Sequence, residues 1–223
     1  MAASLRHCHC TVSHPSCRFR WVYCQLDFLR RCLPQRIRHA LKELPETLDK
    51  TYERALQRIG SANWEFAHRL FQCVAVASRP LRVEELAEFF AFDFGAGSIP
   101  DFDPGWRPEN PRDAVLSICS SLLMVVNIDD SPVKVIQFSH FSVKEFLTSE
   151  RIANAKGTVS RFKVLVEPAH TAMAQACLAL LLKLSSNSNK STIQSIPLAH
   201  YAAQHWVDHA SHSRICHPTS EMG

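Results

Sequence analysis

The spacing of apolar residues leaves the helical period at one point in this chain, and that departure restricts the folds it can adopt. Outside the irregular segments, the apolar positions before residue 122 recur every three or four residues, as they do on one face of a helix. Residues 122–128 are then a β-branched apolar run, 129–132 have the turn sequence Asp-Asp-Ser-Pro, and 133–138 return at strand spacing. The pattern predicts one β-hairpin in an otherwise helical protein.

Three helices are expected directly before this hairpin. Asn63 can cap the first, and acidic residues fill the first turn of the second, where the helix dipole favours them. The helices are expected at 64–78, 83–90 and 114–122. Proline and glycine are dense between 93 and 112, which predicts a loop without regular structure. Three helices followed by a hairpin are the order of a winged-helix domain.

The hairpin is followed by a strong signal for the start of a helix. Ser142 is the expected N-cap, and Glu145 three residues later completes a capping box. Phe141 and Phe146 have the spacing of a hydrophobic staple around that cap. We therefore expect a well-defined helix immediately after the second strand.

Helical segments flank the winged helix on both sides, so the expected fold class is mainly α, with a partly α-solenoid-like C-terminus. Amphipathic stretches precede residue 60, and two further helices are expected at 169–184 and 197–209. The expected division is a disordered tail (1–17), a helical segment (18–60), the winged helix (61–151), a helical linker domain (152–212) and a second disordered tail (213–223).

Glycine is scarce, with six residues in 223, which is well under the ~7% of an average protein. None of the six opens a G-x-x-x-x-G-K-[ST] or G-x-G-x-x-G run, in which glycines let backbone N–H groups approach phosphate. The G-x-S-x-G and H-E-x-x-H motifs are missing as well. We therefore expect no catalytic residues, no enzymatic activity and no bound cofactor.

Charge and cysteine usage indicate a cytoplasmic protein. The net charge is only +4, which does not mark a nucleic-acid-binding polyelectrolyte, and the longest aliphatic stretch, 176–182, is too short for a membrane span. The first residues lack an apolar signal region, and the nine cysteines are an odd number. Reduced thiols in the cytoplasm are the expectation, with neither a membrane nor a nucleic acid as partner.

Four stretches carry a resemblance to a known family. They read FRWVYCQL at 19–26, LPETLDKTYER at 44–54, RPLRVEELAE at 79–88 and FSHFSVKEFL at 138–147. In this order and spacing they resemble the region after the nucleotide-binding domain of NACHT-type signal-transduction NTPases, especially those followed by ankyrin repeats. Residues 63–149 are also similar to the winged-helix domain of GPI inositol-deacylase-like proteins.

The resemblance implies partners and one site residue. It begins at the very end of a NACHT domain, with Cys17-Arg18 in place of the usual glycine-hydrophobic pair, so we expect a truncated member or partial gene product. It implies that the chain packs against a NACHT domain, with ankyrin repeats in full-length relatives. It also implies that His140 descends from a histidine that senses the β-phosphate of bound ADP. The alternative for His140 is a structural histidine at a strand–helix corner.

Two other groups have metal-ligand residue types. His205, His209 and His212 share one helix face at a spacing that can bind zinc, but Trp206 stands where a catalytic glutamate would follow. The N-terminal run His7-Cys8-His9-Cys10 could chelate a soft metal. Packing and a solvated rim explain the helix histidines better, and the N-terminal run, with His14 and Cys17, is crowded and untethered, so no metal site is expected.

The alternative function is a DNA-binding winged helix, in which the third helix would read the major groove. Residues 111–123 contain one arginine and one aspartate among apolar and small residues, which favours a packing helix instead. The basic residues at 30–38 lie before the winged helix and are typical of a solvated face or a partner contact. The preferred hypothesis is a non-catalytic regulatory and interaction module.

Overall fold

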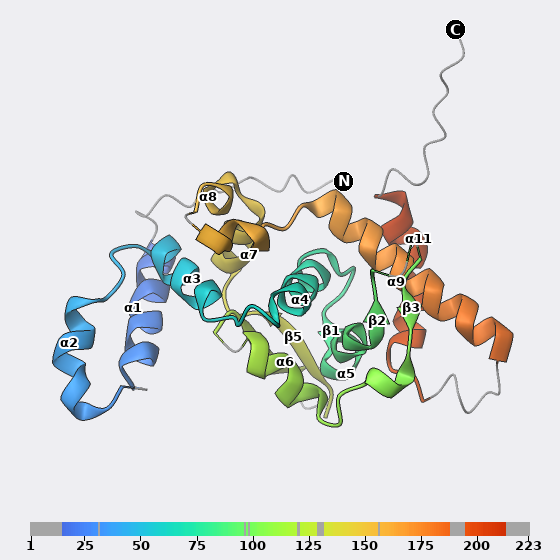
Figure 1. Ribbon diagram of the computed structural model, residues 1–223, viewed down its shortest axis with the longest axis horizontal. Coiled ribbons are helices and arrows are strands. Elements are labelled where there is room, and N and C mark those ends of the chain that lie inside the picture. Colours follow the sequence, from blue (N-terminus) through green and yellow to red (C-terminus); the bar gives the residue numbers. More distant parts are fainter. Residues whose placement is uncertain are drawn as a thin grey trace, which may run out of the picture.

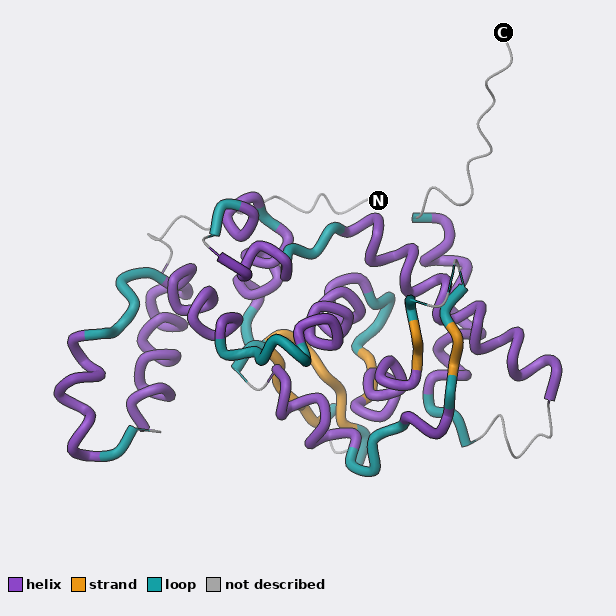
Figure 2. The backbone as a smooth tube through the Cα atoms, in the orientation of Figure 1, coloured by secondary structure: helices purple, strands orange, loops and turns teal. Residues whose placement is uncertain are grey.

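The winged helix is present in the computed structural model of the protein (Figure 1). The structure describes residues 15–30, 32–95, 97, 99–119, 121–128, 132–155, 157–187 and 195–212. Helices dominate the described residues, and the few strands lie within the green and yellow part of the chain (Figures 1 and 2). The mainly helical fold class is thereby confirmed, while the partly α-solenoid-like C-terminus stays a prediction.

The winged helix consists of three helices and a three-stranded sheet. Its elements are α4 (Trp64–Val76), β1 (Leu81–Arg82), α5 (Val83–Ala87), α6 (Pro111–Cys119), β4 (Leu123–Asn127) and β5 (Lys134–Phe138). The strand order is β1-β5-β4, antiparallel throughout, with Ile136 opposite both Leu81 and Val125. The hairpin was predicted correctly, whereas β1 was missed because two residues are too short to show a period.

The segment at 93–112 contains regular structure, contrary to the expectation. The 3-10 helix η2 (Glu88–Ala91) leads into β2 (Phe92–Asp93), which pairs with β3 (Asp101–Phe102), and η3 (Pro104–Trp106) follows. The rings of Phe92 and Phe102 are both buried, with centroids 4.8 Å apart. This aromatic pair stabilises a small ribbon that the surrounding prolines and glycines obscured in the sequence.

The helix after the hairpin, α7 (Phe141–Thr148), begins differently from the prediction. Its N-cap is His140 rather than Ser142, because the His140 ring nitrogen Nδ1 accepts the backbone N–H of Ser142. Glu145 is therefore too far along the helix to complete a capping box. Phe141 is half exposed and lies against the His140 ring instead of forming the expected staple.

A buried ion-pair group fixes the start of α5. Glu85 is fully buried and accepts two hydrogen bonds of 2.7 Å from the Arg79 guanidinium and one from the backbone N–H of Arg82. Burial alone would raise the pKa of Glu85, but the bonds from Arg79 and Arg82 outweigh it and hold that pKa below its usual value. The carboxylate thus stays charged inside the domain.

The C-terminal helices belong to the same hydrophobic core as the winged helix. They are α8 (Glu150–Ala153), η4 (Gly157–Phe162), α9 (Val166–Asn187) and α11 (Leu198–Ser211). Helix α9 packs on α4 and along α11. Two bonds connect α11 to the winged helix: Ser78 N–H donates to Tyr201 Oη, and Arg82 donates to the carbonyl of Pro197.

The N-terminal helices lie at one end of the molecule and contact it mainly through α3 (Figure 1). They are α1 (Pro15–Arg30), η1 (Pro34–Arg36), α2 (Ile37–Lys42) and α3 (Leu48–Gln57). Helix α1 begins within the segment expected to be a disordered tail, and residues 1–14 and 213–223 lie outside the described part. Trp21 Nε1 donates to the Pro45 carbonyl, which anchors α1 to the chain before α3.

Candidate functional site

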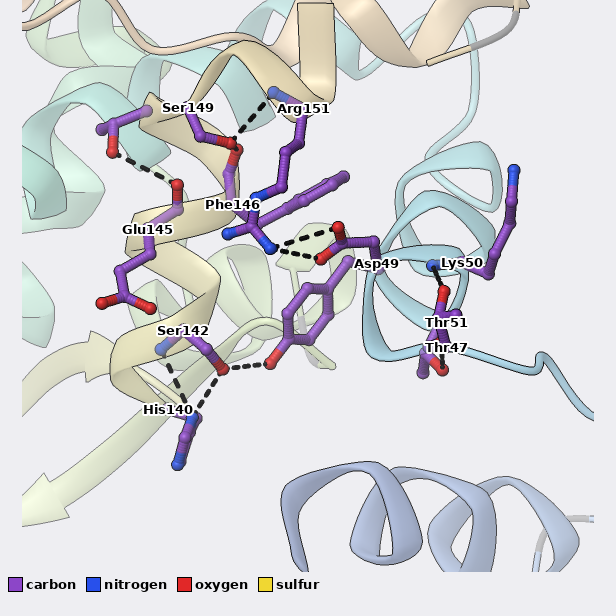
Figure 3. A network of polar contacts seen from close by, with 12 residues as sticks. Thr47, Asp49, Lys50, Thr51, His140, Ser142, Glu145, Phe146, Ser149 and Arg151 are labelled. Carbon is purple, nitrogen blue, oxygen red and sulfur yellow. Dashed lines mark hydrogen bonds and ion pairs between the residues drawn. The ribbon is translucent and has the colours of Figure 1, made fainter. Parts of the chain in front are cut away.

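His140 lies at the corner between strand β5 and helix α7, where the wing meets the next helix (Figure 3). Its backbone is extended, and its Nδ1 atom lies 2.6 Å from Ser142 Oγ and 3.3 Å from Ser142 N. The local role expected as an alternative is therefore real, because His140 caps α7. An acceptor Nδ1 leaves the ring proton on Nε2, which can still donate a hydrogen bond.

The environment of His140 favours the neutral imidazole. Burial, together with the positive charge of Arg20, lowers the pKa of His140 below its ordinary value. A protonated ring would lose the Nδ1 acceptor that caps the helix. The ring is thus held as a neutral donor and acceptor at pH 7.

The His140 corner is connected to the N-terminal helices by two long-range contacts. Tyr52 Oη of α3 lies 2.8 Å from Ser142 Oγ, and Arg20 of α1 donates to Ser139 Oγ at 2.5 Å. Sequence reasoning missed Arg20 because its partner is 119 residues away. These contacts make α1, α3 and the wing one polar network.

A second contact joins α3 to the helices after the wing. Arg151 at the start of α8 donates to both carboxylate oxygens of Asp49 at 2.9 and 3.1 Å (Figure 3). Burial raises the pKa of Asp49 and outweighs the opposing effect of Arg151. Both bonds come from the single nitrogen Nη1, so the carboxylate faces one tip of the guanidinium rather than its two-nitrogen fork.

The Ser142–His140 pair has the residue types of an activated nucleophile but not the access. Ser142 is only 3% exposed, and its hydroxyl is shared between His140 and Tyr52. A substrate carbonyl could not approach that oxygen without displacing α3. The pair is suited to fixing a helix start rather than to acyl transfer.

The histidines at 205, 209 and 212 do not converge on a metal. His209 is fully buried, with Nε2 2.8 Å from Tyr201 Oη and Nδ1 2.9 Å from Nδ1 of His170 on α9. His205 instead faces Asp208 at 2.9 Å. Within the described residues there is no group of three metal-ligating side chains. The sequence did not indicate His170, because it lies on a different helix.

The N-terminal histidine and cysteine run is the last candidate metal site named from the sequence. The run at 7–10 lies outside the described residues, so its chelating ability stays untested. Among the described residues, no helix is sufficiently long and apolar to cross a membrane.

Comparison with known proteins places these features in context. The family model for the GPI inositol-deacylase winged helix domain matches residues 52–165, which include α4 through α7 and the His140 corner. A curated relative from Monascus ruber, named azaphilone pigments biosynthesis cluster protein L, is 36% identical over 179 residues. That alignment covers 78% of this chain but only 37% of the relative's length. No solved structure gives a significant match.

Proposed function

The chain belongs to the family of the GPI inositol-deacylase winged helix domain, and on this basis we propose that it is a non-catalytic regulatory module of a NACHT/ankyrin-type signalling NTPase. In this proposal the chain has no P-loop of its own. It packs against a nucleotide-binding NACHT domain, acts in the cytoplasm and transmits the state of that domain.

The observation that carries the proposal is an apolar face on α1 that nothing in the described chain covers. Phe19, Val22, Tyr23 and Leu26 are 77%, 43%, 58% and 49% exposed. Their positions i, i+3, i+4 and i+7 place them on one side of the helix. Such a stripe is normally buried against another element, so α1 has the character of a docking helix.

The polar network described above gives this docking helix a route to the wing. Arg20 lies on α1 next to the apolar face and is bonded to Ser139, beside His140. A partner that shifts α1 would therefore act directly on the wing-to-helix corner. The proposed mechanism is a rigid-body movement between two states that the partner's nucleotide stabilises unequally.

His140 fits this mechanism as a residue inherited from a phosphate sensor. Its capping bond uses Nδ1, so Nε2–H would be the atom that meets a phosphate held by the NACHT domain. In this proposal the chain alone binds no nucleotide. Calorimetry with ADP should accordingly give no heat with this chain alone, and a nucleotide-loaded complex should lose ADP faster after His140→Ala.

The docking face can be tested by changing two of its residues. We expect the wild-type chain to self-associate and to bind the dye ANS, and the Phe19→Ser/Leu26→Ser double variant to do both less. Leu182→Ser, which removes an equally exposed apolar side chain from α9, is the matched control. Light scattering and ANS fluorescence measure these outcomes. A monodisperse, dye-silent wild-type monomer would contradict the proposal.

A second experiment tests the partner itself. The chain is mixed with a purified NACHT domain, and binding is followed by calorimetry. The wild type and Leu182→Ser should bind, and the Phe19→Ser/Leu26→Ser variant should not. The alternative is a DNA-binding winged helix, and a salt-dependent mobility shift of duplex DNA by the wild-type chain would favour it.

A further inference from the structure

A cavity of about 450 Å³ lies between α1, α3 and the β4–β5 hairpin. Its volume falls in the roughly 300–1,000 Å³ range of small-molecule pockets. The cavity is separate from the exposed stripe of α1, with which it shares only Tyr23. It is also distinct from the hydrogen-bonded side chains of His170, His209 and Tyr201 between α9 and α11.

The charged residues around this cavity all have one sign. Arg20, Arg54 and Arg58 line it, and none of its described lining residues is acidic. Such a wall creates a positive potential in a partly enclosed space, which attracts anions.

The partners of two of these arginines are neutral. Arg20 donates from Nη2 to the Ser139 hydroxyl, while its Nε is shielded from solvent and has no hydrogen-bond partner among the described residues. Arg54 donates to the Glu43 carbonyl and lies over the Phe28 ring at 4.4 Å. A guanidinium fork is best satisfied by a carboxylate or phosphate, and neither Arg20 nor Arg54 has such a partner among the described side chains.

The rest of the cavity wall is apolar and aromatic. Leu122 and Leu123 are buried beneath it, Met124 lies at its edge, and Tyr23 and Phe28 contribute rings. Inorganic anions gain nothing from such a surface, whereas a ligand with a flat hydrophobic body would bury area against it. The cavity therefore combines an anion-binding side with an apolar side.

We propose that this cavity binds a small amphipathic anion, with a carboxylate or phosphate head between Arg20 and Arg54 and an aromatic or aliphatic body against Leu122 and Met124. The ligand would lie between α1 and the wing and would hold the two together. This site shares only Tyr23 with the docking face of α1, and ligand binding there does not require a NACHT partner.

Calorimetry of the whole chain with four probes tests the ligand chemistry. Phenyl phosphate and benzoate carry both features, inorganic phosphate lacks the body, and benzyl alcohol lacks the charge. We expect saturable heat with phenyl phosphate or benzoate, and the stronger of the two identifies the head group. Inorganic phosphate should bind at least about tenfold more weakly, since a buried ring is worth ~2 kcal/mol, and benzyl alcohol should not bind.

Amide shifts and variants then test the location. In the wild-type chain, the better probe should shift the backbone amide resonances of residues 51–58 and 121–124. This measurement does not depend on whether any variant folds. Arg54→Gln should weaken binding by roughly tenfold, the usual effect of losing one charge-assisted hydrogen bond. Arg38→Gln removes an exposed arginine from α2, outside the cavity, and is the matched control.

The possible results distinguish a specific site in the cavity from diffuse attraction to basic residues. Absence of saturable heat with both amphipathic probes, or equal losses in Arg54→Gln and Arg38→Gln, would overturn the proposal. Shifts confined to α2 would do the same, because they would indicate only diffuse attraction to basic residues. The Phe19→Ser/Leu26→Ser variant should bind the probe normally, so failure of the docking proposal would leave this result readable.

Discussion

Acid should weaken this protein through the buried histidine His209. At neutral pH its uncharged ring joins Tyr201 on one side and His170 on the other. Burial, helped by the neighbouring His170 ring, lowers the pKa of His209 from 6.5 to about 4. The folded protein therefore resists a proton that the unfolded chain accepts.

The sign and magnitude follow from that difference. Between pH 6.5 and 4 the unfolded chain binds the extra proton, so the free energy of unfolding falls as the pH falls. At 1.36 kcal/mol for each pKa unit, His209 alone accounts for a loss of about 3 kcal/mol. Stability from this residue is fully present above pH 6.5 and is gone near pH 4.

Urea unfolding followed by circular dichroism between pH 7 and pH 4 measures this loss. His209→Gln retains a donor and an acceptor but cannot titrate. As the pH falls, its free energy of unfolding should therefore decrease less steeply than that of the wild type, with a difference in slope of about 1.4 kcal/mol per pH unit. His200→Gln is the matched control, because it removes an exposed histidine from the same helix. Equal slopes in the wild type and His209→Gln would refute the reasoning.

Three further outcomes are expected. Glu85→Gln should destabilise the fold by about 3 kcal/mol in urea unfolding, because Arg79 would lose a buried counter-charge, and a loss under ~1 kcal/mol would speak against that role. Burial raises the pKa of the Cys177 thiol to about 12 and raises the pKa of the Cys73 thiol as well, so neither thiol should react with a thiol reagent until urea unfolds the chain. Tyr52→Phe should cost roughly 1 kcal/mol, measured in the same way, by removing the bond to Ser142, whereas an unchanged midpoint would show that this bond adds nothing.

The fold could be predicted from the sequence where a pattern of apolar residues extends over many positions. The hairpin was found because Val125, Ile136 and their neighbours form two apolar runs around a turn. The helix after it was found from the residues at 141–146, which signal a helix start. Strand β1 was not found, since it depends on pairing with a strand more than 50 residues away. The Asp101–Phe102 strand was missed for the same reason: its partner Phe92, not its own composition, makes it extended.

The candidate site around His140 was likewise predictable from the sequence only in part. His140 was singled out through the family resemblance, and the structure places it at the end of the second wing strand as expected, while its role as a phosphate sensor stays a prediction. Its neighbours Arg20 and Tyr52 carry no local signal, because they reach the corner from helices about 90 to 120 residues away. The N-cap is His140 rather than Ser142 because Nδ1 of His140 accepts the Ser142 N–H, while the Ser142 hydroxyl is engaged by Tyr52 and His140.

The bonds from Ser78 and Arg82 to α11 have an evolutionary consequence. The match to the family model ends at residue 165, yet these two bonds reach Pro197 and Tyr201 beyond it. The unit that folds together is therefore longer than the segment that the family model matches. Substitutions at 78–82 and 197–201 should be inherited together in relatives that keep both β1 and α11.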